Sequence, residues 1–460
     1  MLVREPQPPA LPVLLLCSLV ACWRPGRALV AKQKKELTEM LAPHQYAIGE
    51  AAGAELLAHT ARALSEADPS LVVVALDAKN AFCTVSREEC MKALAEAAPE
   101  LLPFAELFCC RTSQYVFWDG LGRCHRLEAT DGVDQGDPLA PLLFACGMRK
   151  RLRDLETRLR TAAEAKGLPL SSVSVLAYLD DVVVVVPAAL APEVLPTASA
   201  ALSDLGLELQ PGKTQAWSPL SPCPAGMEGQ WRENGLTLVG VPVGDPLPPG
   251  GLPAEGDEGR VDVGNADFAS QRCLEVATRA AQLLEKLAEL PTAASPHHPA
   301  VQVAALLLRT CGVCKITHLL RTSPPASVQG AATAFYRTVL QVYEAIAQLD
   351  PLTPEQEAQC RLPLREGGRG LRSQSSLAPA AWVASWAQCL AGVRARSGVA
   401  SLSNLETCPL PLAAACLEAA ASLPAAEEAA PTGMDPAEAP WPRLQRTLCK
   451  QLDRETETAF

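Results

Sequence analysis

Continuous apolar runs are the strongest pattern in the first half of the chain. Residues 71–76 read LVVVAL, Val173 to Leu176 is also apolar and β-prone, and five consecutive valines fill 182–186 before Pro187. β-branched side chains favour an extended backbone, and a short apolar run without a polar face is typical of a strand buried on both sides. The pattern therefore predicts three buried strands at these positions.

Helical spacing of apolar residues dominates much of the remaining sequence. A helical pattern extends over 32–67, and an amphipathic helix is expected over 88–98, with Ser86 as its N-cap and Pro99 at its end. Residues 110–127 instead predict a strand, a tight turn at an Asp-Gly pair and a second strand. Further helices are expected at 148–160, 268–290, 301–320 and 326–349. The pattern therefore predicts a chain that mixes strands and helices.

Carboxylates lie at the ends of the predicted strands. Asp77 follows the first strand, and Asp180 and Asp181 lie at a tight turn between the other two. Like charges at the edge of an apolar core are costly, and a divalent cation would offset that cost. Two strands that each deliver a carboxylate can hold two Mg²⁺ ions about 4 Å apart for phosphoryl transfer. For the Asp180-Asp181 pair alone, an ordinary hairpin turn is an equal alternative, because Asp is common in turns.

Five motifs then make the pattern specific. They occur in the order LDAKNAF (76–82), GVDQGDPLAPLLF (132–144), AYLDD (177–181), GLELQPGKTQ (206–215) and LVGVPVG (238–244). In content, order and spacing this set resembles the palm motifs of the reverse transcriptases of non-long-terminal-repeat, LINE-like retrotransposons. The resemblance implies a right-hand polymerase architecture: an α+β palm with an antiparallel sheet, reduced fingers and a helical thumb-like region.

The resemblance also implies a reaction and its metal ligands. The reaction is RNA-directed DNA synthesis, in which deoxynucleotides are added to a primer 3′-hydroxyl. Asp77 and Asp180 would bind two Mg²⁺ ions, with Mn²⁺ as an alternative, and Asp181 would assist them. The implied partners are an RNA template, a DNA primer and deoxynucleoside triphosphates. A rival interpretation is an inactive retroelement remnant that binds nucleic acid without polymerising, since the fingers are shortened.

Four residues are implied to contact the incoming nucleotide. Phe82 would lie under the sugar and exclude a 2′-hydroxyl, and Gln135 and Gly136 belong to a loop that packs against the nucleotide and the template base. Lys213 would reach the triphosphate or act as a general acid toward pyrophosphate. An ordinary core Phe82 and a solvated turn Lys213 remain open alternatives. Asp134 departs from the Arg often found in this loop, and an acid near phosphates would weaken nucleotide affinity.

Two further features are candidate nucleic-acid contacts. The helix at 148–160 is rich in cations, and a phosphate-backbone contact is as plausible as a solvated face paired with Asp154 and Glu156. The cations proposed for that contact are Arg149, Lys150, Arg151 and Arg153. Three aromatic residues between 115 and 118 could stack on bases, but packing in the core is the favoured interpretation for Tyr115, Phe117 and Trp118.

Composition limits the picture without deciding it. The chain has 460 residues and a net charge of -11, which disfavours nucleic-acid binding over the whole surface but permits a local basic groove. The 17 cysteines are scattered through apolar segments, as small buried hydrophobes would be. Cys311-x-x-Cys314 with His318 would suit zinc, but no second pair follows at finger spacing, so core packing is the preferred interpretation.

The predicted organisation runs from a signal-like N-terminus to an Ala/Pro/Glu-rich C-terminus. We expect an intracellular protein, nuclear or cytoplasmic, with no membrane association, no obligate protein partner and no endonuclease region; a secreted protein would rest on the first 23 residues alone. The expected segments are a signal-like or unstructured stretch (1–23), reduced fingers (24–69), a palm (70–245), a Pro/Gly-rich loop (246–267), a helical thumb-like region (268–390) and a partly disordered C-terminal region (391–460).

Overall fold

A computed structural model describes residues 25–109, 111–244, 268–293, 300–423, 444 and 448–452. The predictions for 1–23 and 246–267 lie outside the described residues, as does most of the C-terminal tail beyond 423. The chain divides into two compact units, which are described separately. The first contains the described residues up to Ala54, with Val72–Ala216 and Pro222–Trp231, and the second contains Glu55–Leu71, Trp217–Ser221 and the residues from Arg232 onward. These two units do not coincide with the predicted fingers, palm and thumb-like regions. Those regions stay a prediction.

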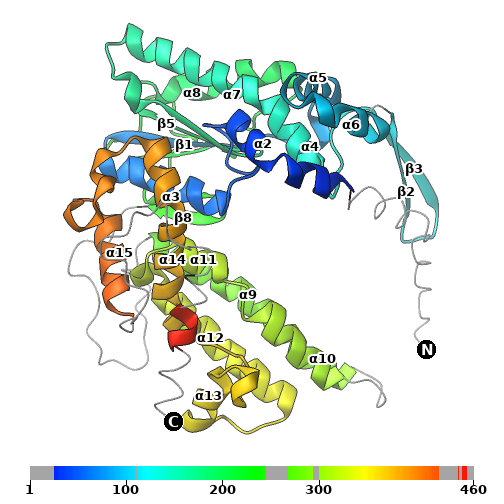
Figure 1. The fold of residues 1–460 in the computed structure, drawn as a ribbon, viewed down its shortest axis with the longest axis vertical. Coiled ribbons are helices and arrows are strands. Elements are labelled where there is room, and N and C mark those ends of the chain that lie inside the picture. Colours follow the sequence, from blue (N-terminus) through cyan, green and yellow to red (C-terminus); the bar gives the residue numbers. More distant parts are fainter. Residues whose placement is uncertain are drawn as a thin grey trace. The chain divides into compact units, whose positions relative to one another are not determined.

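A four-stranded sheet is the centre of the first unit (Figure 1). Its strands are β4 (Ser174–Tyr178), β5 (Asp181–Pro187), β1 (Leu71–Leu76) and β6 (Gln215–Trp217), in the order β4-β5-β1-β6. β4 and β5 are antiparallel, and the valines of β5 are buried. The three strands predicted from apolar runs are therefore confirmed, and the fold is α+β with antiparallel pairing, as expected.

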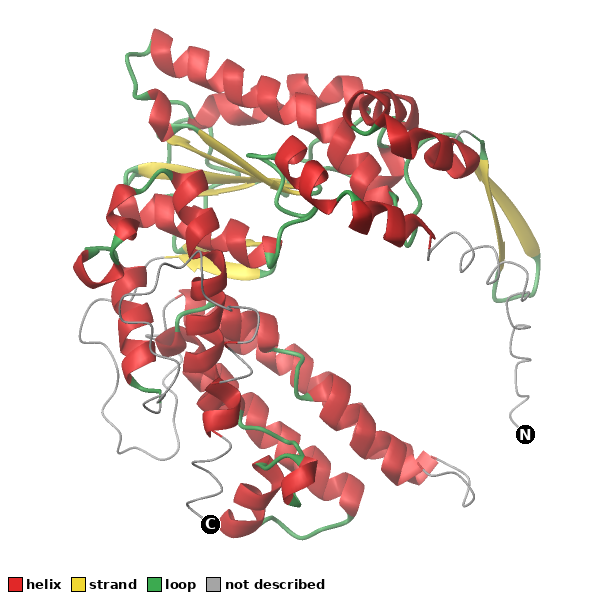
Figure 2. Cartoon of the chain, in the orientation of Figure 1, coloured by secondary structure: helices red, strands yellow, loops and turns green. Residues whose placement is uncertain are grey.

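Helices cover this sheet and complete one hydrophobic core (Figure 2). The longest is α7, whose buried Leu152, Leu155 and Leu159 lie in the same core as the strand residues Val72 and Val184. The helices of the unit are α2 (Lys34–Leu41), α4 (Ala81–Thr84), α5 (Arg87–Ala97), α6 (Leu102–Cys109), α7 (Ala140–Ala165) and α8 (Ala191–Leu202). Ser86 caps α5 as predicted, because its side chain accepts a hydrogen bond from the backbone of Glu89.

The helical pattern predicted over 32–67 forms two helices with a non-helical segment between them. α2 ends at Leu41, and α3 (Gly53–Ala67) begins twelve residues later. Pro43 restricts the residue before it to extended backbone, and Ala42 is extended. The chain between the helices runs beside β4, where Tyr46 N donates to Ala177 O and Ala177 N donates to His44 O, both at 2.8 Å. This long-range pairing is invisible in local periodicity.

A second, separate hairpin extends from the first unit (Figure 1). β2 (Ser113–Trp118) and β3 (Cys124–Ala129) pair antiparallel with each other and with no strand of the main sheet. The predicted strand–turn–strand is therefore confirmed. Core packing of its aromatic residues is wrong for two of them, because Tyr115 is 43% and Trp118 38% exposed.

The second unit is mainly helical, as the periodicity predicted beyond residue 267. Its core lies between α9 and α12, with buried residues such as Leu284 and Phe335. Its elements are α3, a hairpin of β7 (Gly235–Leu238) and β8 (Val241–Gly244), and the helices α9 (Phe268–Ala293), α10 (Ala300–Leu307), α11 (Thr317–Thr322), α12 (Pro325–Ala347), α13 (Pro354–Arg361), α14 (Gln374–Ser397) and α15 (Pro411–Ala421).

The segment Ala300–Thr322 contains α10 and α11. A π-helical turn, Leu308–Gly312, lies between these two helices. By length and composition alone it could cross a membrane, since its most apolar window has a mean hydropathy of 1.5. Leu308, Ile316 and Leu319 of this segment are buried in the core of the second unit. Cys311 and Cys314 in the same segment are exposed, so their predicted core packing is wrong.

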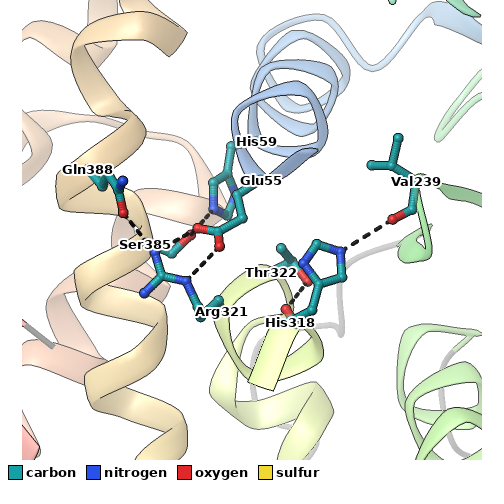
Figure 3. A network of polar contacts seen from close by, with 8 residues as sticks. All are labelled: Glu55, His59, Val239, His318, Arg321, Thr322, Ser385 and Gln388. Atoms are coloured by element: carbon teal, nitrogen blue, oxygen red, sulfur yellow. Dashed lines mark hydrogen bonds and ion pairs between the residues drawn. The ribbon is translucent and has the colours of Figure 1, made fainter. Parts of the chain in front are cut away.

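A buried polar network joins α3, α11 and α14 (Figure 3). The guanidinium of Arg321 binds both carboxylate oxygens of Glu55, at 2.6 and 2.8 Å, and Ser385 donates to the same carboxylate at 2.7 Å. His59 Nε2 lies 2.9 Å from Ser385 Oγ, and burial holds the pKa of His59 well below its usual value. These bonds satisfy charges that would otherwise be costly inside the unit.

Candidate active site

The turn between β4 and β5 presents the two adjacent acids. Tyr178 is paired with Asp181, which leaves Leu179 and Asp180 as a two-residue turn. Leu179 has φ +56°, a left-handed conformation that is strained for a branched residue. Its N–H donates to Gln45 Oε1 at 2.8 Å, so Gln45 fixes the turn from the segment beside β4. No local pattern around Gln45 indicates this role, because the partners are 134 residues apart.

The third acid, Asp77, is held where β1 ends. The backbone beyond β1 pairs with the fourth motif, since Gln210 N donates to Asp77 O and Lys79 N to Glu208 O, both at 2.8 Å. This pairing brings Lys213 to the site, with its Nζ 3.6 Å from Asp77 Oδ2. Asp77 Oδ2 is itself buried and accepts no hydrogen bond. The site thus contains a buried carboxylate oxygen whose cationic neighbour, Lys213, lies beyond hydrogen-bond distance.

Burial and neighbouring charges change the protonation of the two acids in the turn. Burial is the main cause that raises the pKa of Asp180, and the negative charge of Asp77 adds to it. The pKa of Asp181 is raised by burial first and then by the charges of Asp180 and Asp77. Burial and the neighbouring charges both disfavour the ionised form of these two carboxyl groups. The turn and the end of β1 therefore form one electrostatically coupled acidic site.

The chemistry of this site fits a hard divalent cation. Carboxylate oxygens are the preferred protein ligands of Mg²⁺. Asp77 Oδ2 accepts no hydrogen bond, and the acids repel one another, so both features favour a cation there. Among the described residues, no three or more His, Cys, Asp or Glu side chains already form a cage for a metal ion. Mg²⁺ usually keeps water and substrate phosphates as ligands, so Asp77, Asp180 and Asp181 would supply only part of its coordination.

The second motif forms a loop beside Phe82. Gly132 has φ +78°, and a Cβ there would lie 2.5 Å from Cys83 O, so only glycine fits. Backbone bonds from Gly132 N to Val85 O and from Val133 N to Phe82 O hold the loop against α4. Phe82 stacks on Phe144 at 4.7 Å between ring centroids. Its half-buried ring satisfies both the core and the nucleotide interpretations.

A pocket of about 460 Å³ opens at this loop. Three of its lining residues, Phe82, Gln135 and Gly136, are those predicted to contact the nucleotide. The others are Arg27, Asp134, Asp137, Pro138, Ala140 and Pro141. Arg27 is a lining residue that sequence reasoning missed, although its place in a basic N-terminal helix could have pointed to it. The pocket therefore combines one aromatic residue, an amide, a cation and two acids.

Arg87 ties this loop to the base of the β2–β3 hairpin. Its guanidinium donates to Gly132 O and Arg111 O at 2.8 Å, and to Asp131 O and Ser113 Oγ at 3.3 Å. The side chain is buried although it carries a charge. In the sequence, Arg87 looks like an ordinary residue in the first turn of a helix, so its role could be found only from the fold.

The cations predicted on α7 differ in their surroundings. Arg149 donates to Met40 O at 2.9 Å, and Arg151 forms an ion pair with Glu89 at 3.0 Å. Lys150 and Arg153 are more exposed. Arg149 and Arg151 thus have structural partners within the unit, and a nucleic-acid contact of this helix stays a prediction for all four residues.

The fold and the site define a class: an α+β domain whose antiparallel hairpin presents paired carboxylates beside a third on a neighbouring strand. Residues 21–243 match the family "Reverse transcriptase (RNA-dependent DNA polymerase)". This match agrees with the resemblance that the five motifs predicted.

Individual proteins are similar to this chain to different degrees and over different lengths. Over 142 residues the chain is 32% identical to the "Retrotransposable element SLACS 132 kDa protein" of Trypanosoma brucei gambiense, which covers 30% of this chain and 11% of that protein. Telomerase from Candida albicans, solved with a fragment of telomeric RNA, matches at 14% identity with a TM-score of 0.35. Apo telomerase from Candida tropicalis matches at 13% identity with a TM-score of 0.35. Both matches cover 70% of this chain. They cover 51% of the Candida albicans telomerase chain and 54% of the Candida tropicalis chain.

Proposed function

We propose that this protein is an RNA-directed DNA polymerase that adds deoxynucleotides to a primer 3′-hydroxyl. One observation carries the proposal: the β4–β5 turn and the end of β1 bring Asp180, Asp181 and Asp77 into one coupled acidic site within a domain of the reverse transcriptase family. An acidic site that demands divalent cations is what phosphoryl transfer between nucleotides requires.

Each residue of the site has a proposed task. Bound Mg²⁺ supplies Lewis-acid activation of the primer hydroxyl and stabilises the charge on the departing pyrophosphate. Asp77 and Asp180 would hold the ions, and Asp181 would assist. Lys213, which pairs with Asp77 at 3.6 Å, is placed to exchange this partner for a triphosphate oxygen or to donate a proton to pyrophosphate.

The pocket at the second motif is the proposed nucleotide site. Phe82 would lie under the sugar and exclude a 2′-hydroxyl, while Gln135 and Gly136 would contact the nucleotide and the template base. The RNA template and DNA primer would bind along the exposed cations of α7. Such substrates place the working protein inside the cell, in the nucleus or the cytoplasm.

One observation favours the alternative of an inactive remnant. Asp134 and Asp137 both line the pocket, and the charge of Asp134 contributes to raising the pKa of Asp137. Two acids near the position of a triphosphate oppose its binding through electrostatic repulsion. In this alternative, the protein would still bind nucleic acid but would not extend a primer.

The test is primer extension on an RNA template with Mg²⁺ and deoxynucleotides. We expect extension by the native chain and none by the Asp180→Ala, Asp181→Ala double variant. Phe82→Ala should narrow the preference for deoxynucleotides over ribonucleotides, measured as the ratio of the two kcat/KM values. Measurable primer–template binding without extension by the native chain would instead establish the inactive remnant.

A further inference from the structure

Within the part of the first unit that the structure describes, the β2–β3 hairpin exposes several apolar side chains. Tyr115, Trp118, Leu121 and Leu127 are all exposed, Leu121 most of all at 79%. The two strands pair only with each other. An isolated two-stranded hairpin is marginally stable in water, and exposed apolar groups commonly mark an interaction site. We therefore expect the hairpin to contact a binding partner.

Its turn is held in one shape. Asp119 accepts hydrogen bonds from the backbone of Leu121 and Arg123 at 2.9 and 3.0 Å, and its second oxygen contacts the side chains of Arg123 and His125. A fixed turn also fixes the register of the two strands. The exposed side chains are thus presented in a defined order along a stiff ribbon.

One face of the ribbon suits a nucleic-acid strand. Cross-strand pairing of Val116 with Arg126 and of Trp118 with Cys124 places Trp118 and Arg126 on the same face as diagonal neighbours. Both are exposed. Aromatic rings and guanidinium planes are the groups on which unpaired bases stack. Segment 111–129 carries three arginines and two acids in a chain whose net charge is -11, so the local charge favours phosphates.

The root of the hairpin is attached to the proposed nucleotide pocket. The Tyr115 hydroxyl donates to Asp134, and Ser113 Oγ lies 3.5 Å from the same carboxylate. Arg87 binds both Arg111 O at the start of the hairpin and Gly132 O in the pocket loop, each at 2.8 Å. A strand that lies on the hairpin would therefore lead directly to the pocket.

We propose that the Trp118–Arg126 face of the β2–β3 hairpin binds the unpaired template strand ahead of the primer end. This inference rests on the proposed polymerase function and names a binding surface for its template. Each strand has six residues, which at about 3.3 Å per residue give a ribbon of about 20 Å. At about 3.4 Å per stacked nucleotide, that length accommodates about six template nucleotides.

The test measures binding of labelled primer–templates to the full chain by fluorescence anisotropy, without nucleotides. The templates carry unpaired 5′ overhangs of none to about twelve nucleotides, which extend past the expected footprint of the hairpin. We expect affinity to rise with overhang length up to about six nucleotides. Trp118→Ala should weaken binding of the long overhangs at least about fivefold, the low end for loss of one base–aromatic stack, and leave the blunt duplex unaffected.

Two control variants separate stacking from folding. Trp118→Phe keeps an aromatic face and should retain the overhang dependence, whereas Leu170→Ala removes another exposed apolar side chain of the same unit and should have no effect. Equal binding by native protein and Trp118→Ala at every overhang would overturn the proposal, as would a loss that is the same for blunt and overhanging duplexes. So would a native dimer that Trp118→Ala dissociates while overhang binding persists, because the face would then bind a second copy.

The outcomes distinguish this inference from the proposed function. The Asp180→Ala, Asp181→Ala variant should keep the overhang dependence although it cannot extend a primer. Extension by the native chain with no effect of Trp118→Ala on overhang binding would sink only the hairpin proposal. Overhang-dependent binding without any extension would sink only the polymerase.

Discussion

At the scale of single residues, burial changes the protonation of a carboxylate in the second unit. Glu66 on α3 is partly buried and accepts a hydrogen bond from Leu412 N at 2.8 Å, in the first turn of α15. Burial raises its pKa to about 7 from an ordinary 4.5, while the Leu412 N–H and Arg62 act in the opposite direction. The protonated carboxyl is thus favoured in the folded protein.

This shift predicts a specific pH dependence of stability. Between about pH 4.5 and 7 the folded protein holds a proton that the unfolded chain has lost, so the free energy of unfolding falls as pH rises through this window. Across this window the protonation of Glu66 changes the free energy of unfolding by up to about 3 kcal/mol, because each pKa unit corresponds to about 1.4 kcal/mol. Urea unfolding of Glu66→Gln should lack this slope, and the exposed control Glu418→Gln should keep it. An unchanged slope in Glu66→Gln would contradict the assignment.

At the scale of elements, the sequence predicts what depends on local pattern. The valine run of β5, the Ser86 cap of α5 and the turn between β4 and β5 all follow from neighbouring residues, and all were found. The break after α2 was missed, because the backbone from His44 to Tyr46 pairs with β4 across the sequence. Exposure of Trp118 was missed because an apolar alternating strand looks the same whether or not another layer covers it.

The residues of the candidate site also divide into those that the local sequence predicts and those that only the fold reveals. The three acids and Phe82 could be predicted as site residues because they follow strand ends within recognisable motifs. Gln45 and Arg87 act through backbone groups that only the fold brings near them, and neither residue type marks such a role in a sequence. Residues that support a site from a distance are therefore the ones that sequence reasoning loses.

Arg87 provides a prediction about the element it anchors. Arg87→Met would leave the carbonyls of Gly132, Asp131 and Arg111 without this donor, and buried unpaired carbonyls are costly. We expect the free energy of unfolding to fall by about 2–4 kcal/mol. The hairpin should also become more susceptible to proteolysis.

A surface cation on the same helix is the matched control. Lys92 pairs with Glu88 and Glu89 in exposed ion pairs, so Lys92→Met should leave the free energy of unfolding close to that of the native protein. Chemical denaturation of the two variants compares them directly. Equal stability of Arg87→Met and Lys92→Met would show that the buried guanidinium does not hold the loop.

At the scale of the whole molecule, the net charge of -11 means that nucleic acid must be held by local cations. If Lys150 and Arg153 contact phosphates, the variant Lys150→Gln, Arg153→Gln should reduce the slope of log K against log salt concentration by about 1.4–1.8. Binding titrations over a range of salt concentrations measure this slope. The variant Lys92→Gln, Lys166→Gln makes the same change in net charge and should leave the slope unaltered. Equal slopes in both variants would remove α7 from the template surface.

The segment from His44 to Tyr46 has a consequence for handling the protein. β4 lies at the edge of the main sheet, and this segment covers it through its bonds to Ala177, while His44 is anchored to Glu156 at 2.8 Å. An uncovered edge strand readily recruits strands from other molecules. A fragment cut at the apparent start of the palm, near residue 70, would expose that edge and invite aggregation. Expression fragments of this domain therefore need to retain the residues before α3.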